Sequence, residues 1–279
     1  MTEALVLGGG GVAGIAWLTG LLTGLADAGR DVTGADVLVG TSAGSTVAAQ
    51  LGSGLPLEEL YARQTEPALQ AAEIMVDVDL GTLGERIGGA LRGATGIVDM
   101  RRAAGRFALG TETVAEDVRR AVVASRLPSH VWPRRALKIV AVEAATGEPR
   151  VFDSGSGVSL VDAVTASCAV PGVWPPATIG GRRYIDGGVR STVNADYAQG
   201  ASRVLVLAPM GSTDLFPTEV PLEQAVGELR ADGAEVAVVE PDEASLAAIG
   251  TNSLDPSTRR PAAEAGRAQG HALRLPWSR

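Results

Sequence analysis

Two short apolar runs near the start of the chain each lead through a glycine-containing turn into a helical segment. Residues 4–7 precede Gly8 and a predicted helix over 15–28, and residues 36–39 precede Gly40 and a predicted helix over 43–51. Short apolar runs bounded by glycine are typical of strands buried on both faces of a parallel sheet. Parallel strands require crossover connections, so the pattern predicts an α/β fold.

The rest of the chain continues this pattern. Further strands are predicted over 138–142, 183–185, 204–208 and 236–239, of which the last two are expected to be buried, with helices over 159–167 and 262–272. Residues 57–126 are mainly helical in pattern, with glycine breaks, which predicts a helical subdomain over one end of the sheet. Because no internal repeat or long linker divides the sequence, residues 1–279 are expected to form one domain.

The charge balance and the single cysteine narrow the classes of function. The net charge is −8 and no run of Lys or Arg occurs, which argues against nucleic-acid binding. Cys168 alone excludes an intrachain disulfide. The sequence has neither the pattern of a signal peptide nor the ~20 consecutive apolar residues of a membrane span. We expect a cytoplasmic protein with, at most, peripheral membrane contact; its oligomeric state is not predicted.

The turn after the second predicted strand reads Gly40-Thr41-Ser42-Ala43-Gly44, a match to G-x-S-x-G. A serine between an apolar strand and a helix is where a nucleophile elbow is found, with its hydroxyl exposed on a sharp turn. The following helix directs its N–H groups toward developing negative charge. The alternative is an ordinary turn in which Ser42 caps the helix.

The turn after the first predicted strand contains four consecutive glycines, residues 8–11. Backbone N–H groups that no side chain covers can bind an anion or an oxyanion. Gly9, Gly11 and Gly14 also match G-x-G-x-x-G, which indicates dinucleotide binding when an acidic residue ends the second strand. Asp31 precedes that strand instead, so an oxidoreductase is disfavoured. A purely structural turn remains open.

Asp186-Gly187-Gly188 follows another predicted strand, and an aspartate there can be held rigidly while the glycines admit a neighbouring loop. By itself this is also a common turn sequence. Histidine is scarce, since His130 and His271 are the only two, and neither lies in a glycine-bounded turn. A Ser-His-Asp triad is therefore not indicated. Neither a metal site nor a cofactor is expected.

The order of these motifs resembles that of the patatin-like phospholipase family. Asp186 stands 144 residues beyond Ser42, and residues 166–176 resemble the family's block of small residues and proline before the aspartate. The resemblance covers about residues 4–208. It implies a three-layer α/β/α sandwich with a mostly parallel central sheet and a helical insertion. It also implies a serine acyl hydrolase that cleaves acyl esters of lipids by a Ser-Asp dyad through an acyl-enzyme.

Carried over by position, the resemblance makes Ser42 the nucleophile and Asp186 the base. It assigns the oxyanion hole to the backbone N–H groups of Gly9, Gly10, Gly11 and Ala43. Five glycines would support the motifs: Gly14, Gly40, Gly44, Gly187 and Gly188. Many members have arginine where this chain has Ala13, so a cation near the lipid phosphate is missing. A neutral ester or thioester is therefore expected in place of a phospholipid. A degenerate member that only binds or regulates is the remaining alternative.

Three side-chain expectations follow. An aspartate with the ordinary pKa of ~3.9 is a weak base, so Asp186 should lie within hydrogen-bond reach of Ser42 Oγ, roughly 2.6–3.2 Å, although the contact should be looser in an empty site. Cys168 is interpreted as an inert buried thiol, and Trp174 as either a core residue or a pocket residue. One helix face could meet an acyl chain, although packing on the sheet is the simpler interpretation: Leu80, Leu83, Ile87 and Leu91.

Overall fold

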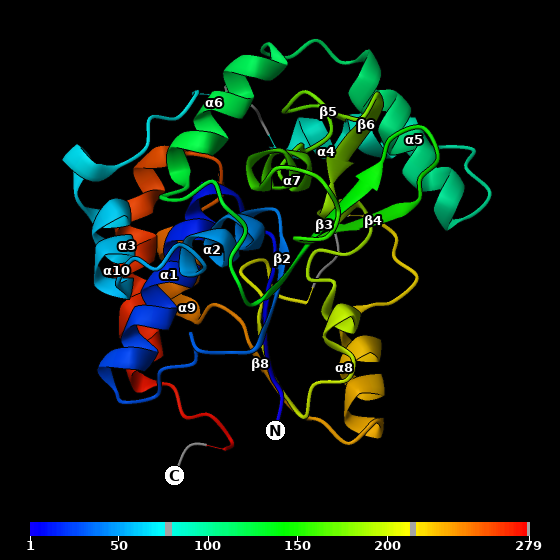
Figure 1. Ribbon diagram of the computed structural model, residues 1–279. Helices are drawn as coiled ribbons and strands as arrows, with labels where there is room; N and C mark the ends of the chain where they lie inside the picture. Colours follow the sequence, from blue (N-terminus) through cyan, green and yellow to red (C-terminus); the bar gives the residue numbers. More distant parts are fainter. Residues whose placement is uncertain (76–79, 213–215, 278–279) are drawn as a thin grey trace.

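The computed structural model (Figure 1) describes residues 1–75, 80–212 and 216–277 and is built around one eight-stranded sheet. The strand order is β5-β6-β3-β2-β1-β7-β8, and β4 pairs with β3. The run from β3 to β8 is parallel, whereas β4, β5 and β6 form antiparallel pairs at one end. Helices cover both faces. The predicted α/β fold with a mostly parallel central sheet is confirmed.

The strands are β1 (Glu3–Leu7), β2 (Val37–Thr41), β3 (Ala136–Glu143), β4 (Pro149–Phe152), β5 (Ala177–Ile179), β6 (Arg182–Asp186), β7 (Arg203–Leu207) and β8 (Glu235–Val239). The α-helices are α1 (Gly11–Asp27), α2 (Ala43–Leu51), α3 (Leu57–Thr65), α4 (Leu80–Leu91), α5 (Ile97–Gly110), α6 (Glu116–Arg126), α7 (Leu160–Ser167), α8 (Leu222–Ala231), α9 (Glu243–Ile249) and α10 (Arg259–Ala272). Four short 3₁₀ turns complete the described elements: η1 (Pro67–Leu69), η2 (Gly187–Val189), η3 (Ala195–Ala198) and η4 (Pro256–Thr258).

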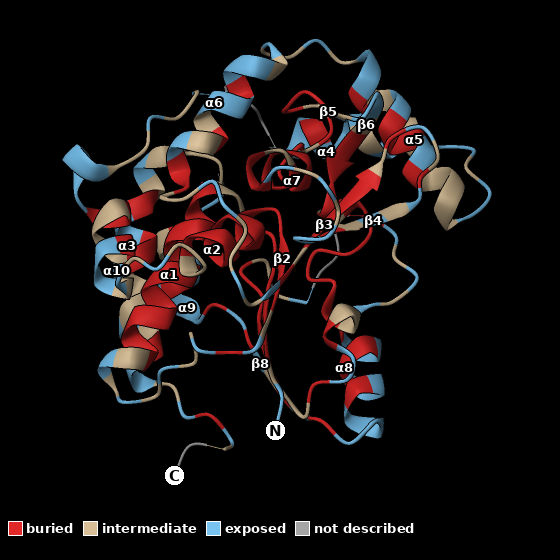
Figure 2. Ribbon diagram, in the orientation of Figure 1, coloured by how far each residue is buried: buried red, intermediate tan, exposed pale blue. Residues whose placement is uncertain are grey.

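The alternation of side chains along β1 explains the two helical layers. Leu5 and Leu7 point into a cluster formed with α1, α2, α7 and α10. Ala4 and Val6 point the other way, into a cluster formed with η3 and α8. Because both sets are apolar, the strand is buried on both faces, as expected of a parallel sheet. Figure 2 shows the buried sheet between α1 and α2 on one side and α8 on the other.

The helices α1 and α10 pack at very short distance, although they are far apart in the sequence. A Cβ atom on Gly20 would lie 2.0 Å from the carbonyl oxygen of Ala263, so a larger residue would force the helices apart. The C-terminal helix is thereby fixed against the helix that follows the glycine-rich loop. Within the described ranges, no helix combines the length and hydropathy that spanning a membrane requires.

The helices predicted for residues 57–126 are present, but they pack on different neighbours. Helix α3 packs against α1 and α10, α6 packs against α7, and α5 packs against α4 and β6. Helix α1 begins at Gly11, four residues before its predicted start, because its first turn contains the glycines that the sequence pattern assigns to a loop. The strands β4 and β5 and the helices α8 and α9 were not predicted.

Candidate active site

Ser42 occupies a sharp turn between β2 and α2. Its φ of 51° and ψ of −116° lie in a region that residues other than glycine rarely adopt, which costs of order 1–3 kcal/mol. The backbone N–H donates to the Ser167 hydroxyl at 2.9 Å, and the side chain makes no capping hydrogen bond to α2. The hydroxyl is therefore left for another role, and the alternative of Ser42 as an ordinary helix cap is not supported.

The glycine after the elbow brings α2 against β1. A Cβ atom on Gly44 would lie 1.9 Å from the carbonyl oxygen of Leu7, and the Gly44 N–H donates to the carbonyl of Gly8 at 3.0 Å. A side chain here would separate the elbow from the glycine-rich loop. The G-x-S-x-G spacing thus positions Ser42 beside the turn that follows β1.

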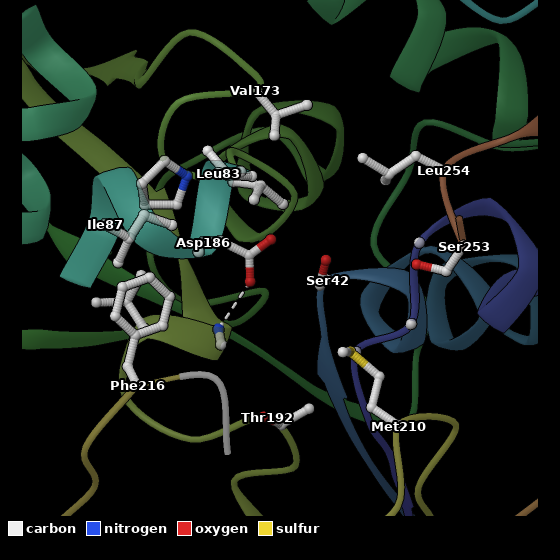
Figure 3. Close-up of a pocket in the computed structure, with 18 of the residues that line it drawn as sticks. Ser42, Leu83, Ile87, Val173, Asp186, Thr192, Met210, Phe216, Ser253 and Leu254 are labelled. Carbon is white, nitrogen blue, oxygen red and sulfur yellow. Dashed lines mark hydrogen bonds between the residues drawn. The ribbon is translucent and has the colours of Figure 1, made fainter. Parts of the chain in front are cut away.

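Asp186 is the last residue of β6, and it lines the same cavity as Ser42. Its backbone N–H donates to the Ala169 carbonyl at 3.0 Å, and its Oδ1 accepts a hydrogen bond of 2.7 Å from the Gly188 N–H. The side chain is buried, and Oδ2 has no hydrogen-bond partner in the described part of the chain. Figure 3 shows this second oxygen on the side of the carboxylate that faces Ser42. One oxygen is thus fixed and the other is left to accept a proton.

The carboxyl group of Asp186 is a stronger base than the sequence suggests. Burial raises its pKa to about 7, against the lowering effects of the Gly188 N–H, the Ser42 hydroxyl and the Arg119 charge. Its proton affinity is therefore matched to neutral pH, as general-base catalysis requires. The Ser42 hydroxyl does not form a hydrogen bond to the carboxylate in the described part of the chain, where Oδ2 has no hydrogen-bond partner.

The backbone N–H groups assigned to the oxyanion hole are not equivalent. Gly9 donates its N–H to the Thr192 carbonyl at 2.8 Å, so its assignment as an oxyanion donor is wrong. The N–H groups of Gly10, Gly11 and Ala43 have no acceptor among the described residues. They lie at the first turns of α1 and α2, where helix dipoles favour negative charge.

A cavity of about 270 Å³ connects Ser42, Asp186 and the glycine-rich loop. Its remaining walls are mostly apolar, and Figure 3 shows side chains from segments as far apart in the sequence as Leu83 and Leu254 around Ser42. Leu83, Ile87 and Leu91 of α4 line it, so this helix face contacts the cavity as well as the core; the side chain of Leu80 lies outside the described residues. Val173, from the block 166–176, also lines the cavity, whereas no pattern in the sequence pointed to the other wall residues: Thr192, Met210, Phe216, Ser253 and Leu254.

Two alternatives, a dinucleotide-binding site and a Ser-His-Asp triad, each need a residue that the structure does not place at the site. Asp31 precedes β2, and its carboxylate accepts hydrogen bonds from Thr33 in a local turn. No acidic residue therefore ends β2, where the dinucleotide fingerprint requires one. His130 and His271 are both exposed, and neither lines the cavity.

Cys168 and Trp174 lie next to the turn at Ser42 but do not line the cavity of about 270 Å³. The Cys168 thiol donates to the Ser42 carbonyl at 3.2 Å, and burial raises its pKa. It is a buried structural thiol, as expected. The ring of Trp174 stacks against the Arg119 guanidinium, with 3.6 Å from the guanidinium carbon to the ring centroid. Trp174 thus belongs to the wall between the elbow and α6.

Comparison with known proteins points to one family. The family model described as "Patatin-like phospholipase" matches residues 5–198. No curated protein matches the sequence significantly. Among solved structures, VipD from Legionella pneumophila is 12% identical, with a TM-score of 0.47, over 96% of this chain and 66% of that one. The type III effector protein ExoU is 14% identical, with a TM-score of 0.40, over 97% and 52%. The chain thus spans about two thirds of one neighbour and about half of the other.

Proposed function

The chain belongs to the patatin-like phospholipase family, and from this premise we propose that it is a serine acyl hydrolase that cleaves acyl esters of lipids with the dyad Ser42 and Asp186. One observation carries the proposal: a strained serine and a buried aspartate with a free oxygen line the same mainly apolar cavity. Strained nucleophiles and carboxylates with raised pKa values are concentrated at active sites.

In the first half of the reaction, Ser42 Oγ attacks the carbonyl carbon of the acyl ester while Asp186 Oδ2 accepts the hydroxyl proton. The negative charge that develops on the carbonyl oxygen is stabilised by the N–H groups of Gly10, Gly11 and Ala43. Each such donor is typically worth roughly 3 kcal/mol of transition-state stabilisation. Collapse of the tetrahedral intermediate breaks the ester bond, and Asp186 returns the proton to the leaving alcohol.

In the second half, a water molecule takes the position that the alcohol has left. Asp186 removes a proton from this water, whose oxygen attacks the acyl carbon on Ser42. The acid is released, and Asp186 returns the proton to Ser42 Oγ. Because the pKa of Asp186 is raised by burial to about 7, the same group can act as base and as acid near neutral pH.

The cavity supports an acyl chain of medium length as the part of the substrate that is bound. Its volume of about 270 Å³ lies near the lower limit for ligand pockets. Apolar side chains of α4 and of the segments after α7 and after β7 would replace water around the chain.

Hydrolysis of p-nitrophenyl octanoate tests the proposal. Ser42→Ala should abolish turnover, and Asp186→Asn should lower kcat/KM by roughly 10²–10⁴-fold, because the base is lost while its shape is kept. Asp117→Asn, an equivalent change at an exposed position of α6, is the control and should leave turnover unchanged. Wild-type activity in either dyad variant, with normal thermal unfolding, would refute the assignment.

A further inference from the structure

Arg119 of α6 is a buried cation with unused hydrogen-bond donors. It is 3% exposed, and neither Nε nor Nη1 has a hydrogen-bond partner among the described residues. One face of the guanidinium is covered by Trp174. Glu73 Oε2 is 3.9 Å from Nη1, and the hydrogen bonds of Glu73 go to Arg126 and Arg259. Buried donors without a partner cost free energy, which favours a polar atom beside Arg119.

A cavity of about 20 Å³, here called the small cavity, is lined by both Arg119 and Ser42. It shares Ser42, Gly11, Val170 and Leu254 with the cavity of about 270 Å³, here called the large cavity. The small volume holds one water molecule and is too small for a carboxylate or a phosphate. Because the two cavities have wall residues in common, a water in the small cavity lies next to the group that reacts at Ser42.

The small cavity offers the polar partners that a buried water needs, roughly two to four in number. Arg119 has two N–H donors to offer, and the side chain of Ser42 has an oxygen that accepts. Burial lowers the pKa of Arg119 to about 9, so it is charged at neutral pH and its hydrogen bonds are charge-assisted. The large cavity is mainly apolar and holds water less well.

We propose that the small cavity holds the water that hydrolyses the acyl-enzyme, with Arg119 as the residue that positions it. The inference rests on the proposed hydrolase function. Once the alcohol has left, this water moves to the acyl carbon on Ser42. Its oxygen bonds to that carbon while Asp186 Oδ2 accepts its proton. The bond from the carbon to Ser42 Oγ then breaks, Asp186 returns the proton to Oγ, and the free acid leaves.

Partition of the acyl-enzyme between water and methanol tests this proposal. Turnover of p-nitrophenyl octanoate in a fixed concentration of methanol gives octanoic acid from water and methyl octanoate from methanol. Methanol has two heavy atoms, so it must enter through the large cavity. The ratio of acid to methyl ester is set after the acyl-enzyme forms, so it does not depend on the rate of acylation. The Arg119 charge lowers the pKa of Asp186, but the same base serves both nucleophiles.

Arg119→Gln should lower the ratio of acid to methyl ester by about tenfold, because the charge-assisted hydrogen bond to the water is lost. Arg120→Gln is the matched control. Arg120 is the next residue on α6, its side chain is 46% exposed, and it pairs with Asp162. The control should therefore keep the wild-type ratio.

Val12→Ile tests the small cavity with the Arg119 charge in place. Val12 is buried and lines the small cavity but not the large one. The added carbon atom should take the space of the water, so the ratio of acid to methyl ester should fall here too. Val118→Ile makes the same change at an exposed position of α6 and should keep the wild-type ratio. This variant pair also decides the matter if Arg119→Gln does not fold.

A crystal structure of the wild type provides a readout that does not require turnover. It should show an ordered water roughly 2.7–3.2 Å from Nε or Nη1 of Arg119. The proposal is overturned if no water occupies this position, or if both Arg119→Gln and Val12→Ile keep the wild-type ratio. Failure of the proposed function looks different, because the wild type would then form neither product. The hydrolytic role would fall with it, and the crystal structure would still decide whether Arg119 binds water.

Discussion

The backbone N–H of Ser42 donates to the hydroxyl of Ser167, the last residue of α7, at 2.9 Å. Both groups are buried. The turn that presents the proposed nucleophile is therefore held by a side chain 125 residues further along the chain, and α7 is part of the scaffold of the candidate active site. The same hydrogen bond uses the Ser42 N–H, so this group does not contribute to the oxyanion hole.

Replacing Ser167 by alanine should destabilise the elbow. The change leaves the buried Ser42 N–H without an acceptor, which typically costs about 1–3 kcal/mol. Urea unfolding should show that loss, and kcat on p-nitrophenyl octanoate should fall as the turn loosens. Ser125→Ala removes an exposed hydroxyl on α6 and should change neither quantity. A Ser167→Ala protein with wild-type stability would mean that water replaces the hydroxyl without cost.

Backbone strain at Ser42 should appear as a difference between two inactive variants. Ser42→Ala and Ser42→Gly both remove the proposed nucleophile, but only glycine adopts a φ of 51° with a ψ of −116° without strain. After allowance for the larger entropy of glycine in the unfolded chain, Ser42→Gly should be more stable than Ser42→Ala by about 1 kcal/mol. Equal midpoints in chemical unfolding would indicate an unstrained turn.

The raised pKa of Asp186 predicts the pH dependence of activity. Because the dyad needs the ionised carboxylate, kcat/KM should rise with pH through about 7 and level off above it. An aspartate with its ordinary pKa would instead keep full activity down to about pH 5. The pH–rate profile on a neutral ester distinguishes these cases, and a flat profile between pH 5 and 8 would contradict the burial effect.

The same shift predicts a pH dependence of stability. The folded state holds a proton on Asp186 up to about pH 7, whereas the unfolded chain releases it near pH 3.8. Folding therefore takes up a proton between these pH values. The stability that the protonated Asp186 contributes to the folded state is lost as pH rises through this window. The free energy of unfolding of Asp186→Asn, taken relative to that of the wild type, should therefore increase by on the order of 3 kcal/mol between pH 4 and pH 8. Parallel stability curves for the two proteins would rule this out.

A larger side chain in the wall of the cavity beside Ser42 should reduce the space for the acyl chain and shorten the preferred chain length. Ile87→Phe adds volume on the face of α4 that lines the cavity, so activity on p-nitrophenyl octanoate should fall relative to that on p-nitrophenyl butyrate. Val118→Phe makes a similar enlargement at an exposed site on α6 and should leave the ratio unchanged. An unchanged ratio in Ile87→Phe would place the acyl chain elsewhere.

The local patterns of the sequence predicted the parts of the site that depend on neighbours in the chain. The apolar runs of β1 and β2, the elbow at Ser42 and the strand end at Asp186 are encoded by residues within a few positions of each other. Local patterns of this kind predict the folded structure correctly because a buried strand followed by a glycine turn has few alternative structures. The start of α1 was misplaced, since glycine has low helix propensity and Gly11 is its first residue.

Other properties depend on partners that are distant in the sequence. The Gly9 N–H is used by the carbonyl of Thr192, and Phe216 and Leu254 reach the cavity from beyond β7. The pKa of Asp186 is set mainly by burial, and the hydrogen bonds of Glu73 go to Arg126 and Arg259, while Nε and Nη1 of Arg119 have no hydrogen-bond partner among the described residues. None of these relationships has a pattern within one short segment, so they emerge only from the packed structure.

The central claim is that Ser42 is a nucleophile activated by Asp186. A fluorophosphonate probe, followed by peptide mass spectrometry, measures this most directly, because the probe forms a stable covalent bond with an activated serine. We predict labelling at Ser42 in the wild type, none in Ser42→Ala, and much slower labelling in Asp186→Asn. Labelling of a different residue, no labelling of the folded wild type, or an undiminished rate in Asp186→Asn would contradict the account.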